Sequence, residues 1–560
     1  MDFDSAPWFA CYGRTPRHLD YPAKSMYGCL EDAAKKFPHK MAYEFMGFKL
    51  SYRRFMKRVE VCARALVSRG VKKGDRVTIC LPNVPQALDM VYAVNRLGAI
   101  ANMVHPLSAE KEIEFCLNDS QSVLAITLDQ FASKFEAVLD NVPRLKTLVI
   151  TGPCDTLPAF ARVYSRLKEH PPKRRLLKDC IFYREFIKGG AEAALPENDA
   201  KAEDDAVILY SGGTTGVSKG IMLSNNAFNA VGMQVMATNP MFKPGDRMLA
   251  VLPLFHGFGL GICVHTMLMS GGGAVLVPRF NLKSYAKALA RKKPNFIAGV
   301  PTMFEALIHL EDVKKLNLSY LKGVYSGGDS LGRELKRRID EFLFSHGSPV
   351  QIREGYGLTE CISASCLTPF DTYKEGSIGI PLPDMYFKIV AAGTENELPA
   401  GEEGEICLSG PTVMERYVNN PEETEKVLRT HSDGKIWLHT GDLGNMDSEG
   451  YLYFHQRLKR MIVTSGYNVY PSQIEKLLDA HQAVHMSCVV GVDDPYRIKK
   501  VKAFVVLREG IEPDDVIRKK LDAYLRTSVA KYAVPREIEF RTSLPMTKMN
   551  KIDYRQLEKE

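Results

Sequence analysis

Residues 210–220, YSGGTTGVSKG, concentrate the residue types that bind phosphate. The glycines let backbone N–H groups approach an anion and allow positive φ angles; they are Gly212, Gly213 and Gly216. The other side chains offer hydroxyl groups and one positive charge, from Ser211, Thr214, Thr215, Ser218 and Lys219. Residues 206–210 are apolar and predict a short buried strand, and residues 221–223 are apolar again. The sequence therefore predicts a phosphate-binding loop between two ordered elements.

Two common phosphate motifs do not fit this loop. A Walker A motif has glycine before its lysine and Ser or Thr after it, whereas Lys219 lies between Ser218 and Gly220. The dinucleotide fingerprint G-x-G-x-x-G at the start of a helix is absent as well. A flexible Gly/Ser/Thr linker is the alternative, but the preceding strand and the lysine favour a phosphate site.

Length indicates more than one domain, and the composition is ordinary for a soluble enzyme. At 560 residues the chain exceeds one hydrophobic core, so at least two domains are expected. The acidic start of the sequence lacks the basic and apolar regions of a signal peptide, which predicts a cytoplasmic location. The net charge of +8 is modest for this length and does not indicate nucleic-acid binding. The twelve cysteines form no CxxC pair and are expected to be reduced thiols.

Two segments raise the question of membrane contact. Residues 257–277 carry no formal charge, but they include His265 and the glycine run 271–273, so a buried helix followed by a strand is expected. A basic cluster follows two prolines and consists of Lys173, Arg174, Arg175 and Lys178. This cluster is either a solvated surface or a peripheral contact for acidic lipid headgroups.

Alternating segments predict an α/β fold. Strands are expected at 76–81, 99–104, 122–127 and 147–151, with Ser108 as an N-cap between the second and third. A second series follows the loop, at 248–254, 274–280, 296–302 and 321–328. From about Pro381 shorter strands predict a small β-rich module, and a mixed α+β unit follows Gln456. We expect an N-terminal domain, residues 1–456, with two helix-covered, mostly parallel sheets and that module, and a smaller α+β C-terminal domain, residues 457–560.

Four further segments have unusual compositions: 354–360 (EGYGLTE), 439–444 (HTGDLG), 457–471 (RLKRMIVTSGYNVYP) and 544–553 (LPMTKMNKID). Together with residues 210–220 they resemble, in order and spacing, the motifs of the adenylate-forming (AMP-binding) enzyme superfamily. The resemblance covers nearly the whole chain and is greatest to fatty acyl-CoA synthetases, in the wording YGLTEC and GVPTMFEAL. It implies a mobile C-terminal domain with a hinge near Lys459.

The resemblance implies an acid–thiol ligase. Such enzymes use ATP and Mg²⁺ to convert a carboxylic acid to acyl-AMP and pyrophosphate, and then transfer the acyl group to CoA with release of AMP. Positioning and charge neutralisation carry the first step.

The resemblance also implies roles for individual residues. The β- and γ-phosphates would be wrapped by Ser211, Gly212, Gly213, Thr214, Thr215, Gly216 and Lys219. Thr359 would hold the α-phosphate, and Glu360 with Thr214 would bind Mg²⁺. The nucleoside would lie against Gly328, Asp329, Gly355, Tyr356, Asp442, Arg457 and Asn468, with adenine on Tyr356 and the ribose hydroxyls on Asp442.

Four further roles follow from the same resemblance. Lys551 would be the catalytic lysine that reaches the attacking carboxylate and the α-phosphate. After domain rotation Ser465 and Gly466 would receive pantetheine. His256 would lie beside the carboxylate, and the acyl pocket would be lined by residues from Val300 to Phe304 and by Gly327, Gly328, Gly357 and Ile362.

The chain departs from the family pattern at four positions. Gln456 and Asn550 stand where glycine precedes the conserved arginine and lysine, Arg460 where an acidic residue is common, and Tyr554 where arginine is common. Asn tolerates positive φ, so the turn before Lys551 is expected to form. Arg460 beside Lys459 is expected to alter rates rather than the type of reaction.

The predicted function is ATP-dependent activation of a medium- or long-chain fatty acid, or a comparably bulky apolar acid, and its transfer to CoA. One alternative is a stand-alone adenylation enzyme that loads an acyl, aryl or amino acid onto a carrier protein. Another is a non-catalytic nucleotide-binding protein of the same fold. The partners expected are the acid, ATP and CoA, with no nucleic acid, and the chain is expected to be a monomer or a homodimer.

Overall fold

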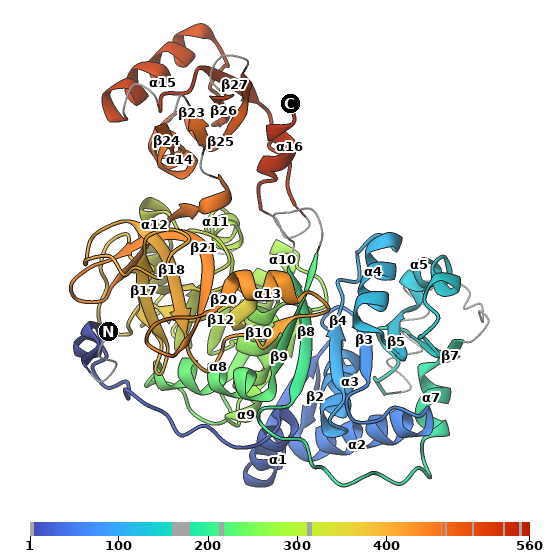
Figure 1. Cartoon of the computed structure of the whole chain (residues 1–560). Helices are drawn as coiled ribbons and strands as arrows, with labels where there is room; N and C mark the ends of the chain where they lie inside the picture. Colours follow the sequence, from blue (N-terminus) through green and yellow to red (C-terminus); the bar gives the residue numbers. More distant parts are fainter. Residues whose placement is uncertain are drawn as a thin grey trace.

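A computed structural model describes residues 5–158, 180–211, 218–310, 316–460, 462–464, 467–494, 498–529, 533–547 and 551–560. For residues 459, 463, 467, 468 and 498 only the backbone is described. The ribbon in Figure 1 shows a large body that holds the sheets of the first 457 residues, with a smaller unit above it.

Within the described residues, eight strands form one sheet, in the order β19-β9-β8-β4-β3-β5-β6-β7. Its strands are β3 (Arg76–Cys80), β4 (Ile100–Met103), β5 (Leu124–Leu128), β6 (Thr147–Thr151), β7 (Cys180–Phe182), β8 (Asp205–Ser211), β9 (Lys219–Ser224) and β19 (Arg416–Tyr417). All neighbours from β8 to β7 are parallel, and β9 and β19 add an antiparallel edge. Burial on both faces explains the continuous apolar runs that predicted these strands.

A second sheet in the described part of the chain has nine strands, in the order β16-β15-β14-β13-β12-β10-β11-β1-β2. They are β1 (Met41–Phe45), β2 (Phe48–Ser51), β10 (Arg247–Ala250), β11 (Gly273–Leu276), β12 (Phe296–Gly299), β13 (Gly323–Ser326), β14 (Ile352–Tyr356), β15 (Cys366–Leu367) and β16 (Ile380–Pro381). The strands from β1 and β11 to β14 pair in parallel. The carboxyl ends of β13 and β14 therefore meet at one edge, which brings Gly328 and Asp329 near Tyr356.

Helices cover both sheets. They are α1 (Met26–Lys36), α2 (Tyr52–Ser68), α3 (Pro85–Arg96), α4 (Glu110–Ser120), α5 (Ala132–Glu136), α7 (Tyr183–Gly189), α8 (Asn225–Ala237), α9 (Thr266–Met269), α10 (Leu282–Lys292), α11 (Pro301–Ile308) and α12 (Arg333–Ser345). Helix α3 is buried at almost every residue because it lies inside the body, against α1 and α2. The predicted cap at Ser108 is wrong: α4 begins after Ala109, whose N–H donates to Glu112 at 2.8 Å.

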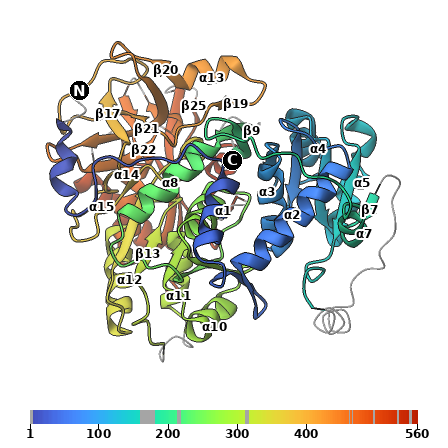
Figure 2. The same cartoon turned by 90° about the horizontal axis from the view of Figure 1, so that it is seen from below.

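The β-rich module contains β17 (Tyr386–Val390), β18 (Gly404–Ser409), β20 (Leu428–Thr430), β21 (Ile436–Met446) and β22 (Leu452–Arg457), and α13 (Pro421–Val427) packs on it. Strand β21 pairs with β18, β20 and β22. Figure 2 shows the N-terminal segment crossing one face of the molecule from this module to α1. Contacts such as Tyr12 Oη to the Pro381 carbonyl at 2.9 Å and Tyr21 Oη to Asp384 at 2.7 Å attach the segment to the module.

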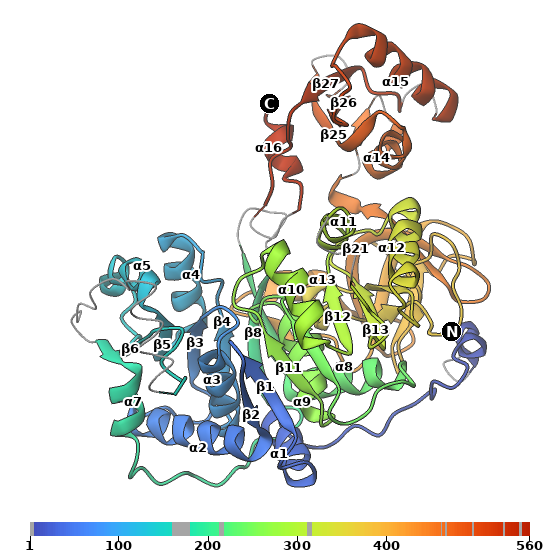
Figure 3. The ribbon, with the colours of Figure 1, turned by 180° about the vertical axis from the view of Figure 1, so that it is seen from behind.

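The smaller unit is a mixed α+β structure. It contains the hairpin β23 (Ile462–Thr464) and β24 (Tyr467–Val469), the sheet β25 (Val484–Asp494), β26 (Ile498–Leu507) and β27 (Glu537–Arg541), and the helices α14 (Pro471–Ala480), α15 (Asp515–Ser528) and α16 (Tyr554–Glu558). Figures 1 and 3 show it above α11 and α12. The predicted fold class is confirmed; the division after residue 456 stays a prediction.

Two other expectations can be compared with the structure. Residues 257–277 form a helical segment, η5 (Phe258–His265) and α9, followed by β11. Among the described residues no helix has both the length and the apolar character needed to span a bilayer. All twelve cysteines are free thiols, as predicted.

Candidate functional site

The predicted phosphate loop joins two paired strands. Strand β8 ends at Ser211 and β9 begins at Lys219, and these two residues are partners in the antiparallel ladder. Lys219 Nζ lies 2.5 Å from Glu423 Oε2 on α13 and 4.7 Å from the centre of the Tyr417 ring. The other predicted ligands in this loop, Gly212, Gly213, Thr214, Thr215 and Gly216, lie outside the described residues. The basic cluster Lys173, Arg174, Arg175 and Lys178 lies outside them too.

Glu360 and Lys219 both contact Tyr417, which places them near each other. Thr359 and Glu360 belong to the short 3₁₀ turn η7 (Thr359–Cys361), which follows β14. The Tyr417 hydroxyl donates to Glu360 Oε1 at 2.8 Å, while its ring lies against the Lys219 ammonium. Strand β19 carries Tyr417 and pairs with β9, so the edge of the eight-stranded sheet brings the lysine and the carboxylate together.

Asp442 is the buried centre of a second group. The Tyr356 hydroxyl donates to Asp442 Oδ2 at 2.8 Å, and Arg457 Nε lies 3.2 Å from Oδ1. Asp442 and Arg457 are direct partners of β21 and β22, which explains their contact. Burial raises the pKa of Asp442, although Arg457 opposes this shift. Asp442 Oδ1 is buried and faces the Arg457 guanidinium, so a ligand hydroxyl that donates to this oxygen would share it with Arg457.

Lys551 belongs to the smaller unit, where two hydrogen bonds join it to Thr547. The Thr547 N–H donates to the Lys551 carbonyl at 2.6 Å, and the Lys551 N–H donates to Thr547 Oγ1 at 3.2 Å. Its ammonium lies within the fields of Asp329, Asp442 and Arg457. Loss of hydration lowers the pKa of Lys551, against the opposing effect of Asp329. The lysine thus joins the Asp442 group from a distant part of the sequence.

Comparison with known families places the chain. The family model described as AMP-binding enzyme matches residues 30–418, and the one described as AMP-binding enzyme C-terminal domain matches residues 473–551. The chain belongs to the AMP-binding enzyme family. The resemblance inferred from the five motifs is thereby confirmed.

Several known proteins match this AMP-binding enzyme over nearly the whole of both chains. A long-chain-fatty-acid–CoA ligase of Bacillus subtilis is 35% identical over 99% of this chain and 98% of its own length. The enzyme of the same name from Salmonella typhimurium is 33% identical, over 96% of this chain and 94% of its own. The crystal structure of ATP-bound MatB from Rhodopseudomonas palustris has a TM-score of 0.82 and 26% identity, and the match covers 96% of this chain and 99% of that one.

In this AMP-binding enzyme, His256 lies just before the helical segment η5, and two residues of η5, Phe258 and Ile262, line an apolar cavity. Burial and the nearby Lys551 charge lower the pKa of His256 to about 4, so the imidazole is neutral at pH 7. The Phe258 N–H donates to His256 Nδ1 at 3.2 Å, which leaves the proton of the neutral ring on Nε2. The segment η5 is a π-helix, a form common at functional sites. A side chain at Gly259 would lie 2.0 Å from the Pro253 carbonyl, so this position requires glycine.

The cavity beside this segment is mainly apolar. It is lined by Val235, Phe258, Ile262, Tyr325, Ser326, Gly327, Gly355, Ser363, Ala364, Leu367 and Leu382. Gly327 was expected there, whereas the sequence assigned Gly355 to the nucleotide. Met303 and Phe304 pack in a neighbouring hydrophobic cluster, with Val300 against it. The acyl role of residues 300–304 therefore stays a prediction.

A strained turn closes one wall of the cavity. Ile362 and Ser363 have φ angles of 54° and 65°, and for the β-branched isoleucine this left-handed conformation is unfavourable. A side chain at Gly357 would lie 2.6 Å from the Ala364 nitrogen. Gly357 therefore makes room for the backbone of this turn, and its place in the acyl pocket stays a prediction.

Two of the departures from the family pattern meet in the smaller unit. The Arg460 guanidinium lies 4.7 Å from the Tyr554 ring centre and pairs with Glu475 at 2.6 Å. These contacts fix Arg460 in place at a position where an acidic residue is common in the family. The side chains of Lys459 and Asn468, and all of Ser465, Gly466 and Asn550, lie outside the described part of the chain.

Sequence reasoning missed three side chains of this site. Glu423 holds Lys219, Tyr417 holds Glu360, and Glu405 lies behind the backbone that carries Asp442. The signal that could have found Tyr417 and Glu423 is the segment RYVNNPEET, which combines an aromatic residue, a helix start and two carboxylates.

Proposed function

We propose that this enzyme is an AMP-forming acyl-CoA synthetase. It activates a carboxylic acid with ATP to acyl-AMP and then transfers the acyl group to CoA. The predicted reaction class is confirmed by the two family models and by full-length relatives named as fatty-acid–CoA ligases. The proposed acid is a medium- or long-chain fatty acid or a comparably bulky apolar acid, supported by the names of those relatives. The cavity beside η5 is small and supports only the apolar character of the acid.

The observation that carries the proposal is the convergence of charges from separate elements. Asp442 and Arg457 come from adjacent strands of the β-rich module, and Lys551 comes from the smaller unit. Glu360 acts on both Asp442 and Arg457 through space, and Tyr417 links it to Lys219. Such a row of cations and carboxylates can bind a triphosphate, a ribose and a divalent cation together.

The order of these charged residues along the site suggests which part of ATP each residue would bind. Asp442 would accept the ribose hydroxyls through Oδ1, beside Arg457, and Tyr356, whose hydroxyl donates to Oδ2, would lie under adenine. Gly328 and Asp329 follow the end of β13 at the same edge of the sheet. Lys219 would hold the departing pyrophosphate together with Ser211. Thr359 and Arg457 would contact the phosphate that stays with the acid.

Lys551 would supply the charge for adenylation. When the substrate carboxylate attacks the α-phosphate, negative charge gathers on oxygens near Lys551, and a positioned ammonium stabilises it. The neutral His256 can lie beside the carboxylate without adding a competing charge. Glu360 would hold Mg²⁺, which neutralises phosphate charge when bound.

A panel of carboxylic acids tests the proposal. We expect acid-dependent release of pyrophosphate from ATP, greatest with medium- or long-chain fatty acids, and formation of a thioester when CoA is added. Pyrophosphate release without a CoA thioester would favour a carrier protein as the acceptor. Absence of pyrophosphate release with every acid would favour a non-catalytic nucleotide-binding protein.

Several finer predictions accompany this proposal. They are the cytoplasmic location, the hinge at Lys459, and receipt of pantetheine by Ser465 and Gly466. Two more are a monomeric or homodimeric state and peripheral membrane contact through the basic cluster.

A further inference from the structure

The strand that carries Asp442 has a bulge at this residue. Cys407 of β18 pairs with His439 of β21, but Glu405, two residues earlier, pairs with Leu443, four residues later. Residues 440–442 of β21 therefore lie opposite the single residue Ile406 of β18, so β21 has two extra residues here, and Gly441 has a φ angle of +67°. A bulge turns a side chain away from the regular ladder and removes ladder hydrogen bonds from its own backbone. Here it presents Asp442 to the site.

Side chains replace the lost hydrogen bonds. Glu405 Oε1 accepts from the Gly441 N–H at 3.1 Å, and its Oε2 accepts from the Gly393 N–H at 3.2 Å. The Thr440 hydroxyl donates to the Ile406 carbonyl at 2.6 Å and accepts from the Asp442 N–H at 3.1 Å. Both N–H groups that follow Thr440 thus depend on side-chain oxygens for their partners.

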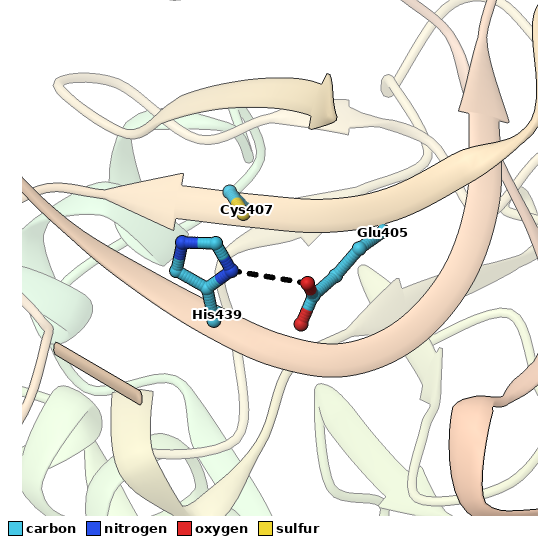
Figure 4. A group of neighbouring side chains, drawn as sticks. All are labelled: Glu405, Cys407 and His439. Atoms are coloured by element: carbon cyan, nitrogen blue, oxygen red, sulfur yellow. Dashed lines mark hydrogen bonds and ion pairs between the residues drawn. The ribbon is translucent and has the colours of Figure 1, made fainter. Parts of the chain in front are cut away.

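Glu405 is buried yet ionised. It is 5% exposed, and burial opposes its charge, but hydrogen bonds from His439, Gly393 and Gly441 hold its pKa below the ordinary value. Figure 4 shows the His439 ring beside the Glu405 carboxylate, with Nδ1 3.0 Å from Oε2. A fixed negative charge therefore lies directly behind the bulge.

The same group offers the ligand types of a metal site, but its nitrogen atoms are already used. Ligand atoms of Glu405, Cys407 and His439 lie within 4.8 Å of one another. His439 Nδ1 pairs with Glu405, and His439 Nε2 lies 2.9 Å from His431 Nε2. Hydrogen bonding thus accounts for both ring nitrogens of His439 without an ion.

We propose that Glu405, together with Thr440, is a positioning residue for Asp442. The carboxylate fixes the bulge at Gly441, and the bulge fixes the Asp442 carboxylate at the distance that ribose hydroxyls require. The proposal rests on the proposed ribose role of Asp442. A site held by hydrogen bonds of this kind loses selectivity when its support loosens by a fraction of an ångström.

The test uses the ribose hydroxyls themselves as probes. Adenylation is measured with ATP and with 2′-deoxy-ATP, and the ratio of the two kcat/KM values gives the preference for the hydroxyl. We expect the wild type to favour ATP by roughly tenfold or more, since the lost hydrogen bond is to a charged group. The Glu405→Gln side chain has one acceptor oxygen in place of two, so it cannot serve Gly441 on one side and His439 and Gly393 on the other. The preference falls several-fold, with a higher KM for ATP and a smaller change in kcat.

Three variants make the result specific. Glu402→Gln removes an exposed carboxylate from the preceding turn and keeps the preference. Asp442→Asn sets the preference that remains without the ribose carboxylate. If Glu405 acts through Asp442, the double variant Glu405→Gln/Asp442→Asn has no lower preference than Asp442→Asn alone. Additive losses would show that Glu405 acts by another route and would overturn the proposal.

Other outcomes distinguish the positioning role of Glu405 from the ribose role of Asp442. A wild type that does not distinguish the two nucleotides would overturn the ribose role of Asp442 and, with it, the positioning role. A folded Glu405→Gln variant that keeps the full preference would overturn the positioning role alone. If Glu405→Gln does not fold, Thr440→Val replaces it: a reduced preference supports the proposal, and an unchanged preference overturns it.

Discussion

Two lysines of the proposed site, Lys219 and Lys551, have opposite surroundings. The Lys219 ammonium is 2.5 Å from Glu423 and lies against the Tyr417 ring, all within the large body. Lys551 comes from the smaller unit, where a hydrogen bond to Thr547 fixes its backbone. Its ammonium loses hydration and also feels the like charge of Arg457, so its pKa is lowered.

The difference shows how each lysine can respond to a triphosphate. Lys219 already has a carboxylate partner, so a phosphate must compete with Glu423 for it. Lys551 lies at the surface of the smaller unit, among the charges of Asp329, Asp442 and Arg457, and added negative charge nearby would stabilise its ammonium. We therefore expect Lys219 to contribute to nucleotide affinity and Lys551 to the chemical step.

Replacement of Lys551 gives the largest expected effect. Lys551→Ala should lower acid-dependent pyrophosphate release by roughly a hundredfold or more, because one preorganised charge at a transition state contributes that much. Transfer of the acyl group from supplied acyl adenylate to CoA should stay largely intact. Both half-reactions are measured separately, by pyrophosphate release and by thioester formation.

Lys559→Ala is the matched control for this experiment. It removes an exposed lysine beyond α16, and neither half-reaction should change. Equal loss of both half-reactions in Lys551→Ala would contradict a role confined to adenylation, and with it the expectation that the smaller unit moves between the two steps.

The ion pair at Lys219 gives an intermediate effect with opposite signs for its two partners. Lys219→Met should raise the KM for ATP roughly tenfold, because a charge-assisted contact to phosphate is lost. Glu423→Gln removes the competing carboxylate and should lower that KM by roughly two- to threefold, as expected for a partly exposed pair. Initial-rate kinetics at saturating acid measure both values.

Lys426→Met serves as the control for this pair. Lys426 contacts the other oxygen of Glu423 at 2.6 Å and has no contact with the loop in the described residues, so the KM for ATP should barely change. If Glu423→Gln instead raised the KM as much as Lys219→Met, the carboxylate would be orienting the lysine for phosphate rather than competing with phosphate.

The fold was largely predictable because its strands are buried on both faces. Residues 147–151 match β6, and 76–81 differ from β3 by one residue. The predicted ends of some strands were less accurate. Residues 296–302 were expected to be one strand, but β12 ends at Gly299 because Pro301 begins α11. No local signal distinguishes Ser108 from Ala109 as the start of α4.

The site was predictable only where the motifs themselves carry the chemistry. Asp442, Tyr356 and Arg457 were named from their motifs, and strand pairing brings them together. Glu405 and Gly441 are 36 residues apart, and Glu423 lies 204 residues from Lys219. These contacts follow from the bulge of β21 and the edge pairing of β19 with β9. The sequence alone does not give the register in which the strands pair, so it cannot indicate either feature.

The smallest expected effect concerns acid stability of the Lys219 region. Lys219 and Lys426 hold the pKa of Glu423 at about 2, below its ordinary value of 4.5. Because the folded-state pKa is lowered, the pair stabilises the protein fully above about pH 4.5 and loses this effect as pH falls toward 2. The pair is partly exposed, so its contribution should be less than about 1 kcal/mol. Glu423→Gln should therefore lower the thermal midpoint at pH 7 by at most about 2 °C.

Glu422→Gln isolates the contribution of the ion pair from that of the helix end. Both glutamates lie in the first turn of α13, so either variant loses the same favourable interaction with the helix dipole. Only Glu423→Gln also loses the pair with Lys219. The difference between the two variants should be present at pH 7, shrink below pH 4.5 and decrease in high salt. A difference that did not change between pH 7 and pH 4 would mean that the Glu423 carboxylate stabilises this region by packing, and that Lys219 is free to meet phosphate without competition.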